Sequence, residues 1–253
     1  MPATSRVRDR MLYDIVPAAG APTMAAPSIP SAQRDTRRFD GGATLASAID
    51  GWIECAVLLA GRGLQIRQFL HIDAGRPAAP AVHNLADVVV RDPRVVYTDH
   101  DPRVAAAGAR QLPAGGCGRV RFLHVDLTTA GSSALDDVRA VLDPRQPVAV
   151  IVPPRAGQRG PQGYEAVRKL VAGLPAGSLL ALAAATADAM PRAERRAREA
   201  VGASPHWYSY AQVERLFDGL DLLPPGVLPV RRWTSTHHAT QMPLAWAALG
   251  RRP

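Results

Sequence analysis

Acidic residues stand where short apolar runs of this sequence end. Asp73, Asp99 and Asp126 each come last in such a run. In open α/β sheets, ligands bind just outside the carboxyl ends of the strands. A carboxylate at the tip of the second strand can accept hydrogen bonds from both hydroxyls of a ribose. Asp99 is therefore the predicted ribose ligand of a nucleotide-like cofactor.

Asp99 also has a structural alternative. An aspartate near this point could cap the helix that Pro102 begins, because proline favours the first helical position. Asp101 stands in the better place for that cap, directly before the proline. The helix therefore does not require Asp99 as its cap.

The segments between these acids predict alternating strands and helices. Apolar runs predict strands at 66–73, 94–99, 119–126, 147–152 and 178–185. Helical spacing predicts helices at 79–90, 102–112, 132–142 and 162–174. Parallel neighbours need a helical crossover, so this alternation predicts a doubly wound, Rossmann-like α/β fold with a mostly parallel sheet.

The flanking segments complete one domain. Residues 1–43 are rich in Pro, Ala, Ser and Arg and predict a flexible N-terminal arm, whereas 44–253 form a single predicted domain. Apolar residues at helical intervals predict a helical extension at 43–61 ahead of the sheet. After the fifth strand we expect helices at 191–201 and 209–220, the latter capped by Ser209, and a last strand at 243–250.

Composition narrows the location and the partners. The net charge is +8, but Lys169 is the only lysine among 30 basic residues, and the arginines are interspersed with acids. We therefore do not expect nucleic acid as a partner. No apolar run reaches the roughly 18 residues that span a bilayer, so we expect a cytoplasmic protein without a membrane partner. Cys55 and Cys117 lack metal-ligand spacing, and we expect reduced thiols and no metal site.

The order of several motifs carries a family resemblance. FLHIDAGRP, VHNLA, VVYTDHDPRV, FLHVDLT, PVAVIV and FDGLDLLPPGVLPVRRW follow one another between about residues 45 and 250. This succession resembles the S-adenosylmethionine-dependent methyltransferase family of high-GC Gram-positive bacteria, a family of unassigned function, as a divergent member. The resemblance implies a class I methyltransferase fold of seven strands, with 243–250 as an antiparallel strand near the sheet edge.

The resemblance also implies a set of cofactor-binding residues for S-adenosylmethionine. The first motif covers Phe69 to Pro77 and includes His71, Asp73 and Gly75. The second gives Asp99 as the ribose ligand, followed by His100. The third gives Asp126 as the acceptor for the adenine amino group, with Leu127 over the ring. His83 matches a histidine of the family's first helix, but its role stays open, and packing within the helix is the simpler interpretation.

Two residues of the first motif depart from the family pattern. His71 replaces an acid that helps to place the cofactor's amino group, and Asp73 replaces the first glycine of the turn. A glycine lets the backbone approach a ligand without a Cβ, so the Asp73 side chain enters space near the methionine moiety. Its charge would repel the cofactor's carboxylate, yet could pair with its ammonium. The segments 34–43 and 153–163 also match the family poorly.

The catalytic residues stay unassigned, because methyl transfer asks mainly for positioning of the acceptor and removal of one proton at most. His206 and His237–His238 lie in segments that could cover the strand ends and offer bases. Trp207, Tyr208 and Tyr210 could line an acceptor pocket or simply pack.

Three functional hypotheses follow from these observations. The first is a methyltransferase acting on a small molecule. The second, motivated by His71 and Asp73, is a methyltransferase-fold protein with lost or weakened cofactor binding that acts as a binding or regulatory subunit. A nicotinamide-dependent enzyme ranks third, because the Gly-x-Gly-x-x-Gly pattern is absent. The sequence leaves a homodimer open.

Overall fold

The computed structural model describes residues 43–75, 81–112, 119–129, 132–193, 195–196, 206–233 and 243–253. The predicted arm over 1–43 lies outside the described residues except for its last residue. Among the described helices, none is long and apolar enough to cross a membrane.

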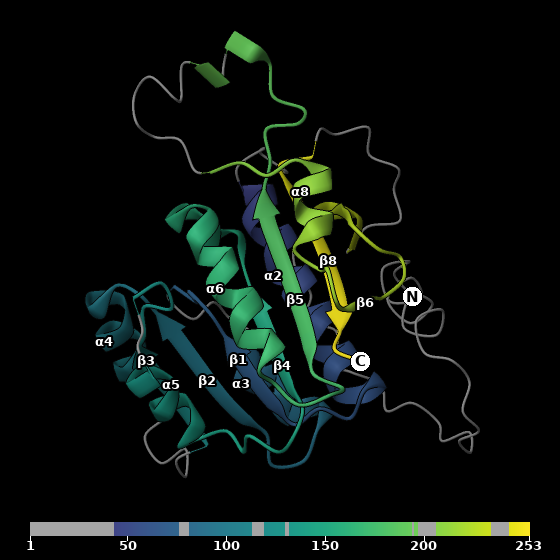
Figure 1. Ribbon diagram of the computed structural model, residues 1–253. Coiled ribbons are helices and arrows are strands. Elements are labelled where there is room, and N and C mark those ends of the chain that lie inside the picture. Colours follow the sequence, from purple (N-terminus) through teal and green to yellow (C-terminus); the bar gives the residue numbers. More distant parts are fainter. Residues whose placement is uncertain are drawn as a thin grey trace, which may run out of the picture.

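One mixed sheet of eight strands forms the centre of the molecule (Figure 1). Neighbouring strands bond in the order β3-β2-β1-β4-β5-β8-β6, and β7 pairs with β8 outside this path. The strands are β1 (Gln68–His71), β2 (Arg94–Asp99), β3 (Val120–His124), β4 (Val148–Val152), β5 (Leu179–Ala185), β6 (Asp221–Leu222), β7 (Leu228–Pro229) and β8 (Ala245–Arg251).

The sheet confirms the predicted class I methyltransferase arrangement. The five predicted strands are β1 to β5, and their pairings with one another are parallel. The predicted last strand is β8, which runs antiparallel to β5 and to β6 and lies between them. The sheet has eight strands where seven were expected. The sequence assigns six strands to residues; the other two, β6 and β7, escaped prediction because they have two residues each and show no periodicity.

Helices cover the sheet on two faces, and each face has its own apolar cluster. One cluster takes side chains from α2 (Ala43–Leu58), α3 (Val82–Val89) and α4 (Pro102–Gln111). The other takes side chains from α6 (Pro161–Ala172), α5 (Ser132–Arg139) and α8 (Tyr210–Arg215). In Figure 1, α6 lies in front of the sheet and α2 behind it. The central strands are buried on both faces, which explains their continuous apolar runs.

The helix signals in the sequence are largely confirmed. Asp101 caps α4, accepting a hydrogen bond from the Arg103 backbone N–H. Ser209 caps α8 in a capping box with Gln212. The predicted helix over 209–220 ends earlier, however, because α8 stops at Arg215 and turns follow.

Two other predicted helices differ in form or extent. The helix predicted over 43–61 is α2 continued by a π-helical turn, η1 (Leu59–Gly63), and its Trp52 is fully buried. Of the helix predicted over 191–201, the structure describes helical residues only at 192–193 and 195–196.

Candidate functional site

The loop after β1 keeps a glycine-like backbone at the position where the sequence has an aspartate. Asp73 has φ +47° and Gly75 has φ +66°. Left-handed backbone is unfavourable for most residues, but aspartate adopts it more readily than others. The replacement of glycine at position 73 therefore leaves the turn in place.

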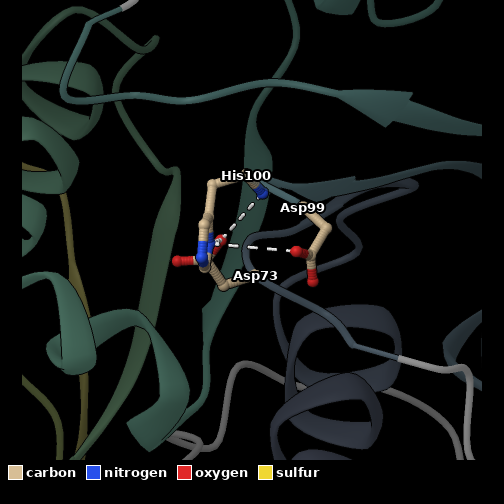
Figure 2. Close-up of side chains that lie close together, drawn as sticks. All are labelled: Asp73, Asp99 and His100. Carbon is tan, nitrogen blue, oxygen red and sulfur yellow. Dashed lines mark hydrogen bonds and ion pairs between the residues drawn. The ribbon is translucent and has the colours of Figure 1, made fainter. Parts of the chain in front are cut away.

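Asp73 turns toward the tip of β2, where it meets His100 (Figure 2). Asp73 Oδ1 lies 2.8 Å from His100 Nδ1 and 3.3 Å from the His100 backbone nitrogen, which donates to it. His100 Nδ1 is also 3.8 Å from Asp99 Oδ1. Potential ligand atoms of these three residues all lie within 4.8 Å of one another. The ends of β1 and β2 thus form one compact polar cluster.

Asp99 is completely buried at the end of β2. Its Oδ2 accepts a hydrogen bond of 3.0 Å from the Gly75 backbone N–H, and its Oδ1 accepts one of 2.9 Å from the Asp101 N–H. Arg155 Nη2 approaches Oδ1 to 3.4 Å. A carboxylate has about four lone-pair sites. Asp99 therefore uses two sites for backbone N–H groups and one for the guanidinium.

Asp126, beyond the end of β3, is held mainly by side chains. Its Oδ1 accepts from the Thr128 N–H at 2.9 Å and from Thr128 Oγ1 at 2.7 Å, and its Oδ2 accepts from Arg159 Nη2 at 2.6 Å. Burial by itself would raise the pKa of Asp126, but the bonds from Thr128 and the Arg159 guanidinium outweigh it and lower that pKa to about 2. Asp126 is therefore a firmly ionised acceptor.

Arg155 and Arg159 are the residues that the sequence analysis missed. Both belong to the 3-10 helix η2 (Pro154–Arg159), which begins two residues after β4 ends. They lie in the segment 153–163, which matches the family poorly, so the resemblance gave them no role. Their position immediately after the fourth strand was the signal that could have found them, since ligands bind beyond strand ends.

Comparison with known protein families decides the class of this chain. The model of the S-adenosyl methyltransferase family matches residues 30–253. The chain belongs to this family. Membership of this family implies S-adenosylmethionine as the cofactor. No protein of curated function matches its sequence.

Solved structures agree with this assignment. A DUF574-family protein from Streptomyces avermitilis is 30% identical to this chain, with a TM-score of 0.72 over 82% of this chain and 83% of that chain. A putative methyltransferase from Thermobifida fusca is 24% identical, with a TM-score of 0.69 over 82% of this chain and 81% of that chain. The N-methyltransferase NodS from Bradyrhizobium japonicum, solved with S-adenosyl-L-homocysteine, is 14% identical over the full length of both chains with a TM-score of 0.51, and shares the fold.

His71 is the unusual residue at the end of β1 in this chain. It is 7% exposed, and neither ring nitrogen has a hydrogen-bond partner. Its ring centroid lies 5.8 Å from that of Tyr97. Burial lowers the pKa of His71 to about 4, so the ring is neutral at physiological pH. A buried polar group without a partner costs about 1–3 kcal/mol, so the burial of His71 is unfavourable for stability.

Other sequence candidates have structural partners. His83 contacts Tyr97 Oη through its backbone N–H at 2.9 Å and through Nδ1 at 2.8 Å, in agreement with a packed helical histidine. Leu127 packs against the cluster beneath α5 and α6. Cys55 donates a hydrogen bond to the Trp233 carbonyl.

Two of the aromatic residues after β5 pack against other rings, although Tyr210 remains 42% exposed. Tyr208 is 7% exposed and packs edge-on against Tyr164, with ring centroids 4.8 Å apart. Tyr210 packs in the same manner against Trp246. His206 is exposed, whereas His237–His238 and Cys117 lie outside the described residues.

A separate cavity of about 430 Å³ lies at the opposite edge of the sheet. It includes Leu180, near the start of β5, and Arg252, which follows β8. Its lining mixes acidic and basic side chains, such as Glu165 and Lys169. The carboxyl edge, with its cluster of engaged carboxylates, is the better candidate for the chemistry.

Proposed function

We propose that the protein transfers a methyl group from S-adenosylmethionine to a small-molecule acceptor, with Asp99 holding the ribose. The main support for this proposal is the number of lone-pair sites on the Asp99 carboxylate that are free to accept hydrogen bonds. The backbone donors Gly75 and Asp101 occupy one site on each oxygen. If Arg155 moves away, one free site remains on each oxygen, which matches the two hydroxyls of a ribose.

Asp126 supports an adenine subsite beside the ribose subsite. Thr128 fills both sites on Oδ1, whereas Oδ2 accepts only from Arg159. Displacement of that guanidinium leaves Oδ2 ready to accept from an exocyclic amino group. Leu127 follows Asp126 directly and would supply an apolar contact for the ring.

His71 supports binding of the methionine end. A neutral imidazole has one nitrogen that accepts hydrogen bonds, and an ammonium group offers three donors. The accepting nitrogen of His71 therefore suits the cofactor's ammonium, in place of the acid that the family pattern has. Asp73 acts as a positioning residue, because its hydrogen bonds fix His100 beside Asp99. The residues present thus fit the cofactor once the arginines have moved.

The chain's contribution to the chemistry is positioning. The bound cofactor supplies an electrophilic methyl group, so the protein must hold the acceptor in line and accept one proton at most. No described residue is assigned as a base. Arg155 and Arg159 are each paired with a carboxylate instead of forming an open basic stripe, which favours a small molecule over nucleic acid as the acceptor.

Calorimetric titration with S-adenosylmethionine and S-adenosylhomocysteine tests the proposal. We expect micromolar binding by the wild type and a loss of at least tenfold in Asp99→Ala. The matched control is Asp136→Ala, which removes an exposed aspartate of α5 that pairs with Arg139 and leaves the strand ends intact. If the wild type shows no binding at millimolar ligand, the result would contradict the proposal and favour a non-catalytic protein with lost cofactor binding.

A further inference from the structure

We propose that Arg155 and Arg159 form a latch that competes with the cofactor for Asp99 and Asp126, and that the displaced latch binds an anionic group of the methyl acceptor. This inference rests on the proposed function. It assigns a carboxylate- or phosphate-bearing acceptor and an order of binding in which the cofactor comes first.

The strand order shows what the latch crosses. Both arginines start from η2, next to the end of β4, and the adjacent strands are β1, β2 and β3 in that order. Arg155 passes the end of β1 to reach Asp99 on β2. Arg159 passes the ends of β1 and β2 to reach Asp126 beyond β3. The guanidinium groups therefore lie where an adenosine held by the same two carboxylates would have to lie.

The backbone beneath the latch is tightly packed. Ala156 is 2% exposed, and a Cβ on Gly157 would lie 2.7 Å from Tyr164 Oη. The Arg155 and Arg159 side chains are more accessible, with 38% and 27% of their surfaces exposed. Displacement therefore requires only that two flexible side chains change rotamer while η2 stays in place.

Arg155 has unused capacity for an anion. Its contact with Asp99 is long at 3.4 Å, and its Nε is buried without a partner. Its guanidinium also lies against the turn at Gly75, where a Cβ would be 3.7 Å from Nη1. A guanidinium presents five donors in a fork that suits carboxylate and phosphate. Once a ribose occupies Asp99, the Arg155 guanidinium loses its ion-pair partner. It can then pair with an anionic group of the methyl acceptor.

A second unpartnered group lies on the same side of the sheet edge. The Tyr208 hydroxyl is buried and has no hydrogen-bond partner. Tyr208 follows β5, its N–H bonds to the Ala185 carbonyl, and its ring packs on Tyr164, which touches Gly157 of η2. The ends of β4 and β5 thus provide hydrogen-bond donors for the methyl acceptor. This part of the site lies beside the part proposed for the cofactor, at the ends of β1, β2 and β3.

The first measurement compares S-adenosylhomocysteine binding in the wild type and in the double variant Arg155→Gln/Arg159→Gln. Loss of two competing ion pairs should tighten the Kd by roughly three- to tenfold. Arg168→Gln is the matched control, because Arg168 is equally exposed at 38% and pairs with Glu165 on α6. Equal or weaker binding by the double variant, with the wild type binding, overturns the latch while leaving the proposed function intact.

The second measurement uses linkage between anion and cofactor. If the displaced latch binds anions, sodium acetate or sodium phosphate should tighten S-adenosylhomocysteine binding to the wild type relative to sodium chloride at equal ionic strength. The effect should vanish in Arg155→Gln/Arg159→Gln and persist in part in Arg155→Lys/Arg159→Lys. The same anion dependence in all three proteins, or none in the wild type, overturns the assignment of an anionic acceptor.

The failure modes of the two proposals are distinguishable. If neither the wild type nor the double variant binds S-adenosylhomocysteine, the proposed function itself fails. If the double variant alone binds, the competition by the arginines is supported, but the proposed function, which requires binding by the wild type, fails. Thermal unfolding of each variant shows whether the substitutions preserve the fold.

Discussion

The buried half and the partly exposed half of the candidate site hold their polar groups in different ways. The inner half comprises His71 and Asp99, at the ends of β1 and β2, and both residues are buried. The outer half is Asp126, beyond β3, whose side chain is 21% exposed. Asp99 is fixed by backbone donors, His71 by none, and Asp126 largely by side chains.

This difference separates residues that stabilise the fold from residues that only contact the ligand. Substitution of Asp99 should affect stability and binding together, because the same oxygen atoms serve both. Substitution in the outer half should affect binding with little loss of stability, because solvent and neighbouring side chains can compensate. The following experiments test that separation, from the largest expected effect to the smallest.

The largest effect on stability is expected when the pH falls and His71, in the inner half, becomes protonated. His71 has a folded-state pKa of about 4 against an ordinary value of 6.5, so the unfolded chain binds its proton first as the pH falls. Stability is therefore full above pH 6.5 and declines toward pH 4, by up to about 3 kcal/mol. Urea denaturation across this range measures the decline.

His71→Leu provides the control for this decline. The variant removes the titrating ring and its unpartnered nitrogens, so its free energy of unfolding should lose this part of the pH dependence. At pH 7 the variant should be as stable as the wild type or more so, yet bind S-adenosylhomocysteine more weakly. An unchanged slope between pH 6.5 and pH 4 would contradict the assignment to His71.

Asp99→Asn should produce the next largest effect. Each oxygen of Asp99 accepts from a backbone N–H, so an amide must turn its NH₂ toward either Gly75 or Asp101. One buried donor then loses its acceptor, which costs about 1–3 kcal/mol. Chemical denaturation measures this loss, and Asp136→Asn is the control. A stability equal to that of the wild type would show that Asp99 is not part of the framework.

Asp126→Asn should weaken S-adenosylhomocysteine binding by about tenfold and lower the free energy of unfolding by less than about 1 kcal/mol. Its acid sensitivity lies in a separate window. Because the folded pKa of Asp126 is lowered to about 2, its stabilising contribution is present above pH 3.8 and is lost as the pH falls toward 2. The difference in stability between wild type and variant should shrink across that window, and a constant difference would refute this account.

Asp73→Gly should have the smallest effect. Glycine accepts the left-handed backbone at this position without strain, which offsets the lost hydrogen bonds to His100. We expect a change in unfolding free energy of less than about 1 kcal/mol and a change in S-adenosylhomocysteine affinity of less than about threefold. A much larger gain in affinity would show that the Asp73 side chain obstructs the cofactor.

The sequence by itself determined where the central strands lie along the chain and which acids stand at their ends. The strands β1, β2, β4 and β5 are buried along nearly all of their length, so each appears as a largely apolar run that needs no knowledge of its neighbours, whereas the edge strand β3 is only partly buried. Helix starts were equally local, because Asp101 and Ser209 bond to backbone groups within three residues. These features depend on contacts close in sequence or on burial alone.

Only the tertiary structure decided how the acids are used. Arg155 and Asp99 are 56 residues apart, and Arg159 and Asp126 are 33 apart, so no local pattern pairs them. Likewise, the isolation of His71 depends on what packs around it from other elements, and β6 and β7 exist only because β8 supplies their hydrogen bonds. Contacts between distant segments arise when the sheet assembles, and they set which carboxylates are covered, which are paired and which group has no partner.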